Sequence, residues 1–242
     1  MKKAEVPMLI EHLQQLYPDA TCELIHRNPF ELLIAVVLSA QCTDKLVNEV
    51  TPGLFEKYPT PEVMAGLTQE EMEEAIRRIG LFRNKAKNIL ETCRRLVEEQ
   101  GGEVPNDYDY LVSLPGVGRK TANVVLSTAF GVPAIAVDTH VDRLSHRLGL
   151  TKATNVLDTE KDLMRKLPKE HWTFTHHALI LHGRRVCAAR SPKCELCPLQ
   201  DICSEYQKNA KAAAKGTKKT TTKATTKATT KATTKASTSA SK

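Results

Sequence analysis

Apolar residues recur along most of the chain at the spacing of one face of an α-helix. Between residues 86 and 97 this pattern is strong, and it stops at Gly101, a typical residue at a helix C-terminus. Thr68 and Glu71 have the spacing of an N-terminal capping box. Further segments with helical spacing are 43–58, which Pro52 should break, 107–113, 119–130, 139–148, 155–166 and 170–185. Because strand-like alternation is almost absent, the sequence predicts an all-α protein of about ten helices.

The stretch from Phe30 to Ala40 is apolar on nearly every side. Such a segment fits a central helix surrounded by others, although periodicity alone leaves a buried strand open. The longest uninterrupted apolar run, Leu32 to Leu38, has seven residues, whereas crossing a bilayer takes about 20. No apolar stretch follows the first lysines, as it would in a signal peptide. We therefore expect a cytoplasmic protein without a membrane partner.

The composition is that of an ordinary folded protein, but the charge is unevenly distributed. With 41% hydrophobic and 26% charged residues, the composition excludes a wholly disordered or collagen-like protein. The length of 242 residues suits one large domain or two small ones. The net charge of +7 comes from residues 208–242, which hold ten lysines and no acid, whereas residues 1–207 carry 25 basic and 28 acidic side chains. Repeats of Lys-Ala-Thr-Thr predict that 208–242 is a disordered tail. Basic clusters at 77–87, 119–120 and 184–193 permit a local basic face on the remainder.

Four of the seven cysteines lie close together in the sequence. Cys187, Cys194, Cys197 and Cys203 have the spacing C-x6-C-x2-C-x5-C within 17 residues, which indicates a single four-thiolate site. Thiolates select zinc or an iron-sulfur cluster. The spacing leaves both open and slightly favours zinc, the commoner structural metal with four cysteine ligands.

The segment LPGVGRKT at residues 114–121 joins two predicted helices. Pro115 should end the first helix, and Gly116 and Gly118 allow a tight turn that points backbone amides outward at the start of the second. Such a turn can bind a phosphate of a nucleic-acid backbone without reading its sequence. Taken alone, the segment is equally well interpreted as a plain connector.

In combination, these motifs closely resemble the endonuclease III family of DNA glycosylases. The matching motifs are LPGVGRKTANVVL at 114–126, VDTHVDR at 137–143, LSAQCTD at 38–44, GLFRNKAKNI at 80–89 and the four-cysteine loop. The resemblance covers about residues 1–206, and the lysine-rich tail lies outside it.

The resemblance implies an all-α helix-hairpin-helix glycosylase fold, in which two helical domains flank a DNA-binding cleft. One domain would span 22–132 and include the hairpin, and the other would combine 1–21 with 133–207. The implied activity is that of a monomeric, nucleoid-associated repair enzyme that removes oxidised pyrimidines from duplex DNA and cleaves 3′ to abasic sites. The implied cofactor is a [4Fe-4S] cluster on the four cysteines, which reverses the preference for zinc.

A glycosylase must flip a nucleotide out of the duplex to reach its C1′ atom. The resemblance assigns the attack on C1′ to Lys120, which would form a Schiff base, and assigns proton transfer or charge stabilisation to Asp138. Without the resemblance, Lys120 fits a phosphate-binding helix lysine and Asp138 a helix N-cap. Because an ordinary lysine is almost wholly protonated at pH 7, we expect burial, Arg119 and the helix N-terminus to favour the free amine.

Other residues that match the family's motifs are implied to contact DNA. Gln41 and Leu81 would fill the gap left by the flipped nucleotide; otherwise Gln41 would cap its helix and Leu81 would join the core. Asp44 would contact the damaged base, and His140 either faces the cleft or lies on the helix surface. The remaining implied DNA contacts are Leu114, Gly116, Val117, Gly118, Arg119, Arg190 and Lys193. Arg185 stands where the family often has an aromatic residue, so its contacts stay open.

Two rival functions share part of this evidence. An adenine-specific glycosylase of the same superfamily would have the hairpin and the cluster but lacks the lysine nucleophile and usually carries an extra domain. A DNA-binding module without enzymatic activity would use the hairpin and the tail alone. Lys120 and the low-complexity tail argue against the adenine-specific class, and the pairing of Lys120 with Asp138 argues against the binding module.

Overall fold

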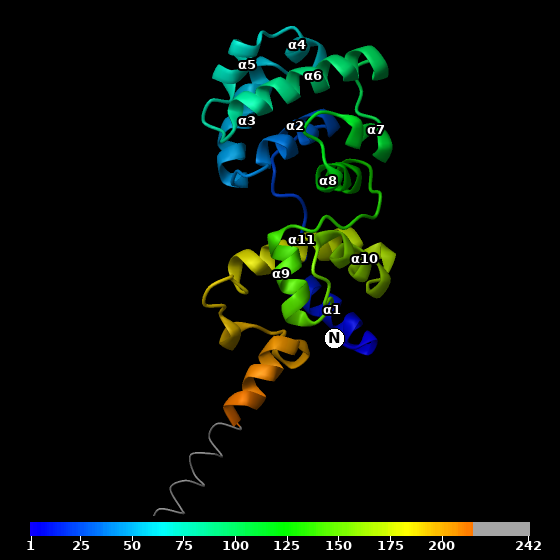
Figure 1. Ribbon diagram of the computed structural model, residues 1–242, viewed down its shortest axis with the longest axis vertical. Helices are drawn as coiled ribbons and strands as arrows, with labels where there is room; N and C mark the ends of the chain where they lie inside the picture. The colour runs from blue at the N-terminus through cyan, green and yellow to red at the C-terminus, as the bar shows by residue number, and fades with distance from the viewer. Residues whose placement is uncertain (215–242) are drawn as a thin grey trace, which may run out of the picture.

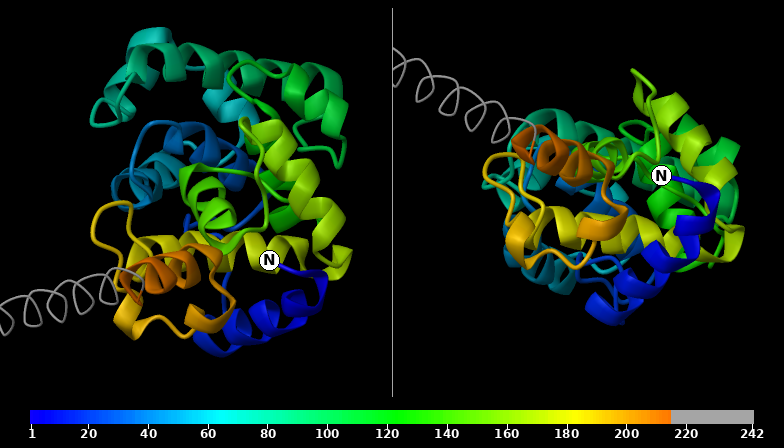
Figure 2. Two further views of the ribbon diagram at one scale, coloured as in Figure 1. Left: turned by 60° about the horizontal axis from the view of Figure 1, so that its bottom comes forward. Right: turned by 90° about the horizontal axis from the view of Figure 1, so that it is seen from below.

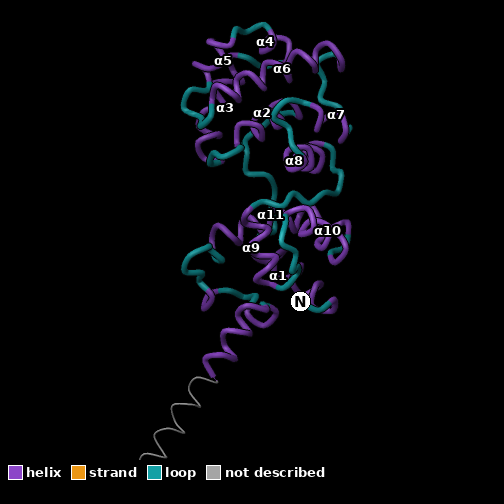
Figure 3. Tube along the Cα trace, viewed as in Figure 1, coloured by secondary structure: helices purple, strands orange, loops and turns teal. Residues whose placement is uncertain are grey.

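The computed structural model describes residues 1–214, and these are helical wherever they form regular secondary structure (Figures 1 and 3). The helices are α1 (Val6–Leu16), α2 (Pro29–Ser39), α3 (Asp44–Lys57), α4 (Pro61–Ala65), α5 (Gln69–Ala75), α6 (Phe82–Gln100), α7 (Tyr108–Ser113), α8 (Arg119–Ala129), α9 (Thr139–Leu148), α10 (Val156–Lys166) and α11 (Trp172–Arg185). The predicted all-α class is confirmed, since residues 1–214 contain no strand. None of their helices has the length and apolar character needed to span a membrane.

Local sequence signals account for many of the helix ends. The predicted capping box at the start of α5 is present, because Thr68 accepts a hydrogen bond from the backbone of Glu71 and the Glu71 side chain accepts one in return. At the end of α6, Gly101 adopts the left-handed conformation with φ +59°. The predicted break at Pro52 is wrong, because α3 continues through it. Burial of Val47 and Leu54 on either side offsets the lost backbone hydrogen bond.

Helix α2 is the centre of the larger hydrophobic core. All its residues from Phe30 to Leu38 are buried, and it contacts α3, α6 and α8. Asn28 caps its N-terminus and Pro29 occupies its first turn, where a missing N–H costs nothing. The alternative of a buried strand is therefore excluded, and the all-round apolar pattern reflects a helix covered on every side.

The buried apolar residues form two separate cores. The larger one surrounds α2 and contains side chains from Leu24 to Ala136, and the smaller one combines α1 with residues from Ile135 to Ile202. In Figure 1, α2 to α8 form the upper layer, whereas α1 lies with α9 to α11 in the lower one. This arrangement supports the two helical domains, with the N-terminal helix joining the C-terminal half. The domain boundaries remain a prediction.

The tail differs from expectation at its start. Residues 204–214 are helical, so the prediction of disorder from residue 208 is wrong for 208–214. Residues 208–214 contain four alanines, and alanine has the highest helix propensity of any residue type. The prediction of disorder relied on the lysine repeats further along the chain and overlooked this signal. Figure 2 shows this helix beside the loop that follows α11. The rest of the predicted tail lies outside the described residues.

Candidate active site

Lys120 and Asp138 line one pocket between the two cores. Lys120 is the second residue of α8, and Asp138 directly precedes α9. The pocket encloses about 550 Å³ of space that is open to solvent, and its walls also include Ser39 of α2 and His176 and His177 of α11. The structure therefore brings together the two side chains that the sequence assigned to the chemistry.

The N-cap role of Asp138 is confirmed and leaves part of the carboxylate available. Its Oδ1 atom accepts hydrogen bonds from the backbone N–H groups of His140 at 2.9 Å and Val141 at 2.8 Å. Within residues 1–214, Oδ2 has no hydrogen-bond partner. The cap fixes the carboxylate in place, and Oδ2 remains available to a molecule in the pocket.

The expected surroundings of Lys120 are only partly present. Its side chain is exposed rather than buried. The positive charge of Arg119 is compensated, because its Nη2 atom lies 2.5 Å from Oε1 of Glu160 and its Nε atom donates to Oε2 at 3.0 Å. The expectation of burial is therefore wrong for this structure, and the charge of Arg119 beside Lys120 is partly balanced by Glu160. The open N-terminus of α8 remains as a source of positive potential beside Lys120.

Two buried histidines in the pocket were missed by the sequence analysis. The His176 and His177 side chains are almost fully buried, and His176 Nδ1 and His177 Nε2 have no hydrogen-bond partner within residues 1–214. Burial lowers the pKa of His176 well below its usual range, with a smaller contribution from the charge of His177, and it lowers the pKa of His177 to about 4. Both rings are therefore neutral at pH 7. A pair of adjacent histidines directly before the apolar run from Ala178 to Leu181 was the available sequence signal.

The predicted hairpin joins α7 to α8 as a tight turn. Gly116 has φ +76°, a conformation that favours glycine. Gly118 is the N-cap of α8 and has no side chain to cap it, so the first amides of the helix are open to an anion. The side chains of Leu114 and Val117 are buried, and the Val117 N–H donates to the Leu114 carbonyl at 3.1 Å. These two residues therefore shape the turn, and a DNA contact through their side chains is not possible without unpacking them.

Gln41 and Leu81 occupy exposed turns with unusual backbone conformations. Gln41 has φ +53° and Leu81 φ +59°, both in the left-handed region. The residue that ends α2 is Ala40, so Gln41 does not cap that helix. Leu81 is 57% exposed and is not a core residue. Both alternatives considered for these side chains are excluded, and their role in DNA remains a prediction.

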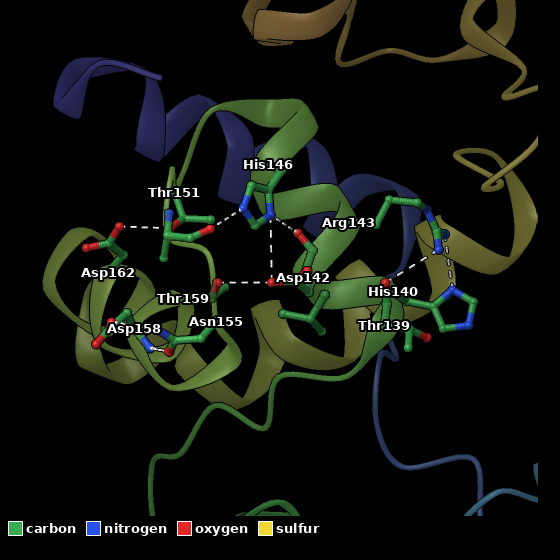
Figure 4. Close-up of polar contacts among 12 residues, drawn as sticks. Thr139, His140, Asp142, Arg143, His146, Thr151, Asn155, Asp158, Thr159 and Asp162 are labelled. Carbon is green, nitrogen blue, oxygen red and sulfur yellow. Dashed lines mark hydrogen bonds and ion pairs between the residues drawn. The ribbon is translucent and has the colours of Figure 1, made fainter.

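Asp44 lines the pocket of Lys120 and Asp138, and together with His140 it also lines a neighbouring hollow. Asp44 Oδ2 accepts a hydrogen bond from Arg184 at 2.7 Å, and Arg184 also pairs with Glu23. His140 is half-buried, and its Nδ1 atom lies 3.3 Å from Nη2 of Arg143 (Figure 4). Burial lowers the pKa of His140. The structure thus places both residues close to the cleft but already engaged with arginines.

Asp138 is the N-cap of α9. A polar network anchors this helix to α10 (Figure 4). Thr159 of α10 donates to Asp142 Oδ1 at 2.9 Å, and His146 bridges the carbonyls of Asp142 and Ala153. Hydrogen bonds from the ring nitrogens to these two carbonyls favour the protonated ring and raise the pKa of His146. The network holds α9 against α10 and so fixes the direction of the Asp138 cap.

The four cysteines of the loop line one cavity beyond α11. Within residues 1–214, no three cysteine, histidine or carboxylate side chains converge closely enough to hold a single metal ion. A four-thiolate zinc site would draw the sulfurs around one ion, so thiols spaced around a cavity fit a multi-atom cluster better. Burial raises the pKa of Cys194 and Cys197, and binding to iron would have to displace their protons.

Two side chains outside the loop support the cysteines and were missed by the sequence analysis. Arg147 donates to Cys187 Sγ at 3.3 Å and to the Ala188 carbonyl at 2.8 Å. Nε2 of His182 lies 3.4 Å from Cys197 Sγ, and its Nδ1 lies 3.0 Å from the Tyr17 hydroxyl. Because burial lowers the pKa of His182 to about 4, its ring is neutral at pH 7. Through these contacts, side chains of α9 and α11 orient the cysteine sulfurs.

The basic residues near this loop lie on the surface. Arg190 and Lys193 are exposed between the first two cysteines, as predicted. Arg185 stacks its guanidinium over the Tyr17 ring at 5.7 Å and approaches Glu23 at 3.7 Å. The departure at Arg185 from the family pattern is therefore accommodated by an aromatic partner from α1's end.

Comparisons with known proteins agree with this site. Residues 34–169 match the HhH-GPD superfamily of base excision DNA repair proteins, and residues 187–203 match the iron-sulfur binding domain of endonuclease III. A Bacillus subtilis protein named endonuclease III is 56% identical over 208 residues, which cover 86% of this chain and 95% of the relative. The chain belongs to the endonuclease III family.

Further relatives of the family extend the match to the structure. The endonuclease III of Escherichia coli K12 is 48% identical over 86% of this chain and 99% of its own. A solved structure described as a trapped endonuclease III–DNA covalent intermediate superposes with a TM-score of 0.82 at 56% identity, covering 87% of this chain and 99% of that one. Membership of the endonuclease III family confirms the helix-hairpin-helix fold and the base-excision-repair class. It also decides the choice of cofactor, a [4Fe-4S] cluster rather than zinc.

Proposed function

We propose that the chain is a bifunctional DNA glycosylase and abasic-site lyase that removes oxidised pyrimidines from duplex DNA. The observation that carries this proposal is the shared pocket of Lys120 and Asp138 beside the hairpin. An amine and a fixed carboxylate facing the same space are what attack on a flipped nucleotide requires.

DNA is held mainly through its backbone. The open amides at the start of α8 would bind a phosphate, and the exposed Arg190 and Lys193 would neutralise others. Gln41 and Leu81 would enter the duplex and offset part of the stacking lost when the nucleotide leaves. The [4Fe-4S] cluster, bound by the four cysteines, would brace the loop that displays Arg190 and Lys193. Because both neighbouring histidines are neutral, their unpaired ring nitrogens offer the pocket hydrogen-bonding groups without added charge.

The chemistry would proceed in two stages. In the first, the free amine of Lys120 attacks C1′, the bond from C1′ to the base breaks, and the base leaves with the bonding electrons. Oδ2 of Asp138 stabilises the positive charge on the sugar and takes the proton lost from nitrogen. In the second, the sugar ring opens to a Schiff base on Lys120, a proton leaves C2′, and the C3′–O bond breaks. Hydrolysis of the Schiff base then regenerates the amine.

The substrate class is tested with duplexes that carry single defined lesions. Purified protein should release oxidised pyrimidines and nick the strand 3′ to the site, should nick duplexes with a pre-formed abasic site, and should do so as a monomer. Release of adenine from a mismatch without nicking would instead indicate the adenine-specific class. Binding without cleavage of any of these duplexes would indicate a DNA-binding module.

A further inference from the structure

Lys85, in the first turn of α6, is buried although it was expected in a basic surface cluster. Only 5% of the residue is exposed. Its Nζ atom donates hydrogen bonds to the carbonyls of Leu38 at 2.8 Å and Ala40 at 2.6 Å. No role in DNA contact or chemistry has been assigned to this side chain, and its burial prevents it from touching DNA directly.

The two carbonyls lie at the C-terminal end of α2, immediately before Gln41. Carbonyls in the last turn of a helix lack partners within the helix, and a cation there is favoured by the helix dipole. Burial lowers the pKa of Lys85, as expected for an amine removed from water. The Lys85 ammonium group is therefore removed from water and is hydrogen-bonded instead to carbonyls at the end of α2. Both hydrogen bonds hold the backbone that leads into Gln41.

The backbone of Lys85 is linked in the same way to Leu81. The Lys85 N–H donates to the Leu81 carbonyl at 3.1 Å and closes the first turn of α6. The neighbouring Gly80 lies against the other turn, since a Cβ atom built on it would be 3.7 Å from the Gln41 carbonyl oxygen. The two exposed turns thus lie next to each other, and Lys85 is hydrogen-bonded to both of them.

Both turns need such support. Gln41 and Leu81 adopt left-handed backbone conformations, which are unfavourable for residues other than glycine and persist only where surrounding contacts determine them. Without the two bonds from Nζ, the backbone that leads into Gln41 would lose these hydrogen bonds to α6. The relative position of the two side chains would then be variable.

We propose that Lys85 is a positioning residue that holds the turns of Gln41 and Leu81 in one arrangement, so that both side chains enter the duplex together. The inference rests on the proposed function, because it gives Gln41 and Leu81 the task of filling the gap in the DNA. It predicts a defect in base flipping rather than a general loss of activity.

The test compares Lys85→Met, which removes the donor, with Lys85→Arg, which keeps a cationic donor. Arg94→Met is the control, since it removes one positive charge from an exposed position on the same helix, where Arg94 pairs with Glu91 on the helix surface. Single-turnover base removal measures the reaction, and the fluorescence of 2-aminopurine next to the lesion reports local unstacking. Binding to undamaged duplex and thermal melting monitor the folded, DNA-competent fraction.

We expect Lys85→Met to slow base removal about 10- to 100-fold, the scale of a small misplacement of a positioned group, and to reduce the unstacking signal. Binding to undamaged duplex should stay within about twofold, Lys85→Arg should restore part of the rate, and Arg94→Met should match the wild type. If Lys85→Met does not fold, Lys85→Arg carries the same comparison with a smaller loss. A parallel loss of undamaged binding and base removal would overturn the proposal, because a merely structural role lowers both.

A mutant cycle then separates this inference from the function on which it rests. In a Gln41→Ala/Leu81→Ala background, Lys85→Met should cost less than about threefold, because nothing is left to position. The same fold-loss in both backgrounds would overturn the Lys85 inference alone. A Gln41→Ala/Leu81→Ala variant with the wild-type rate would overturn the insertion roles and the inference together, and a wild-type protein inactive on every duplex would overturn the proposed function itself.

Discussion

The ion pair between Arg119 and Glu160 allows the contribution of Arg119 to stability to be measured separately from its contribution to DNA binding. Glu160 is buried, with 6% of its side chain exposed, while half of the Arg119 side chain is exposed. Removing one partner of a fully buried pair costs about 3–5 kcal/mol, whereas an exposed pair contributes about 0–1 kcal/mol. The pair in this chain lies between these limits. Arg119→Met should therefore lower the free energy of unfolding by about 2 kcal/mol, because it strands a buried carboxylate.

The prediction is measured by urea unfolding and thermal melting. A loss of about 2 kcal/mol corresponds to a fall in Tm of roughly 4–8 °C for a chain of this size. Glu160→Leu combined with Arg119→Met should recover most of the loss, because no buried charge is left unpaired. An Arg119→Met protein as stable as the wild type would refute the reasoning, as would a double variant that loses the sum of both single effects. If Arg119 also binds phosphate, the plot of log affinity against log salt should flatten by about one unit.

Three further predictions follow from the site. Asp138→Asn should keep the helix cap and slow base removal by about 100-fold or more, whereas Asp138→Ala should also lose about 1 kcal/mol of stability; equal stability of the two would contradict the cap. Because the pKa of His177 is lowered from 6.5 to about 4, its contribution to stability is complete above pH 6.5 and is lost as the pH falls towards 4. His177→Gln should therefore lose less stability over that interval in urea unfolding, by on the order of 3 kcal/mol, and a pH profile identical to the wild type would argue against the burial. Elemental analysis should find about four iron and four sulfide per chain, and Cys194→Ser should lose iron and DNA affinity; one zinc without iron would contradict the cluster.

The sequence was sufficient for the elements whose signals are local. Helical periodicity and the capping box located α5, α6 and α9, and the cysteine spacing located the cluster loop. Local signals placed Lys120 and Asp138 each at the start of a helix, and only the resemblance to the endonuclease III family assigned both to one site.

The contacts that depend on tertiary packing could not be predicted. Arg119 pairs with Glu160, 41 residues away, and Lys85 reaches carbonyls 45 and 47 residues earlier in the chain. Neither pairing can be recognised from local residue spacing. From the sequence alone, Arg119 and Lys85 are therefore expected to be surface charges. His176 and His177 were overlooked for the same reason, since only the fold brings α11 beneath the pocket.

The central claim is that Lys120 forms the covalent bond to DNA. The direct measurement is borohydride reduction during turnover on a duplex with an oxidised pyrimidine, followed by peptide mapping of the trapped adduct. The account predicts one adduct, on Lys120, and no trapping by a Lys120→Gln variant that still binds the lesion duplex. Undiminished trapping by Lys120→Gln, or an adduct mapped to another residue, would contradict it.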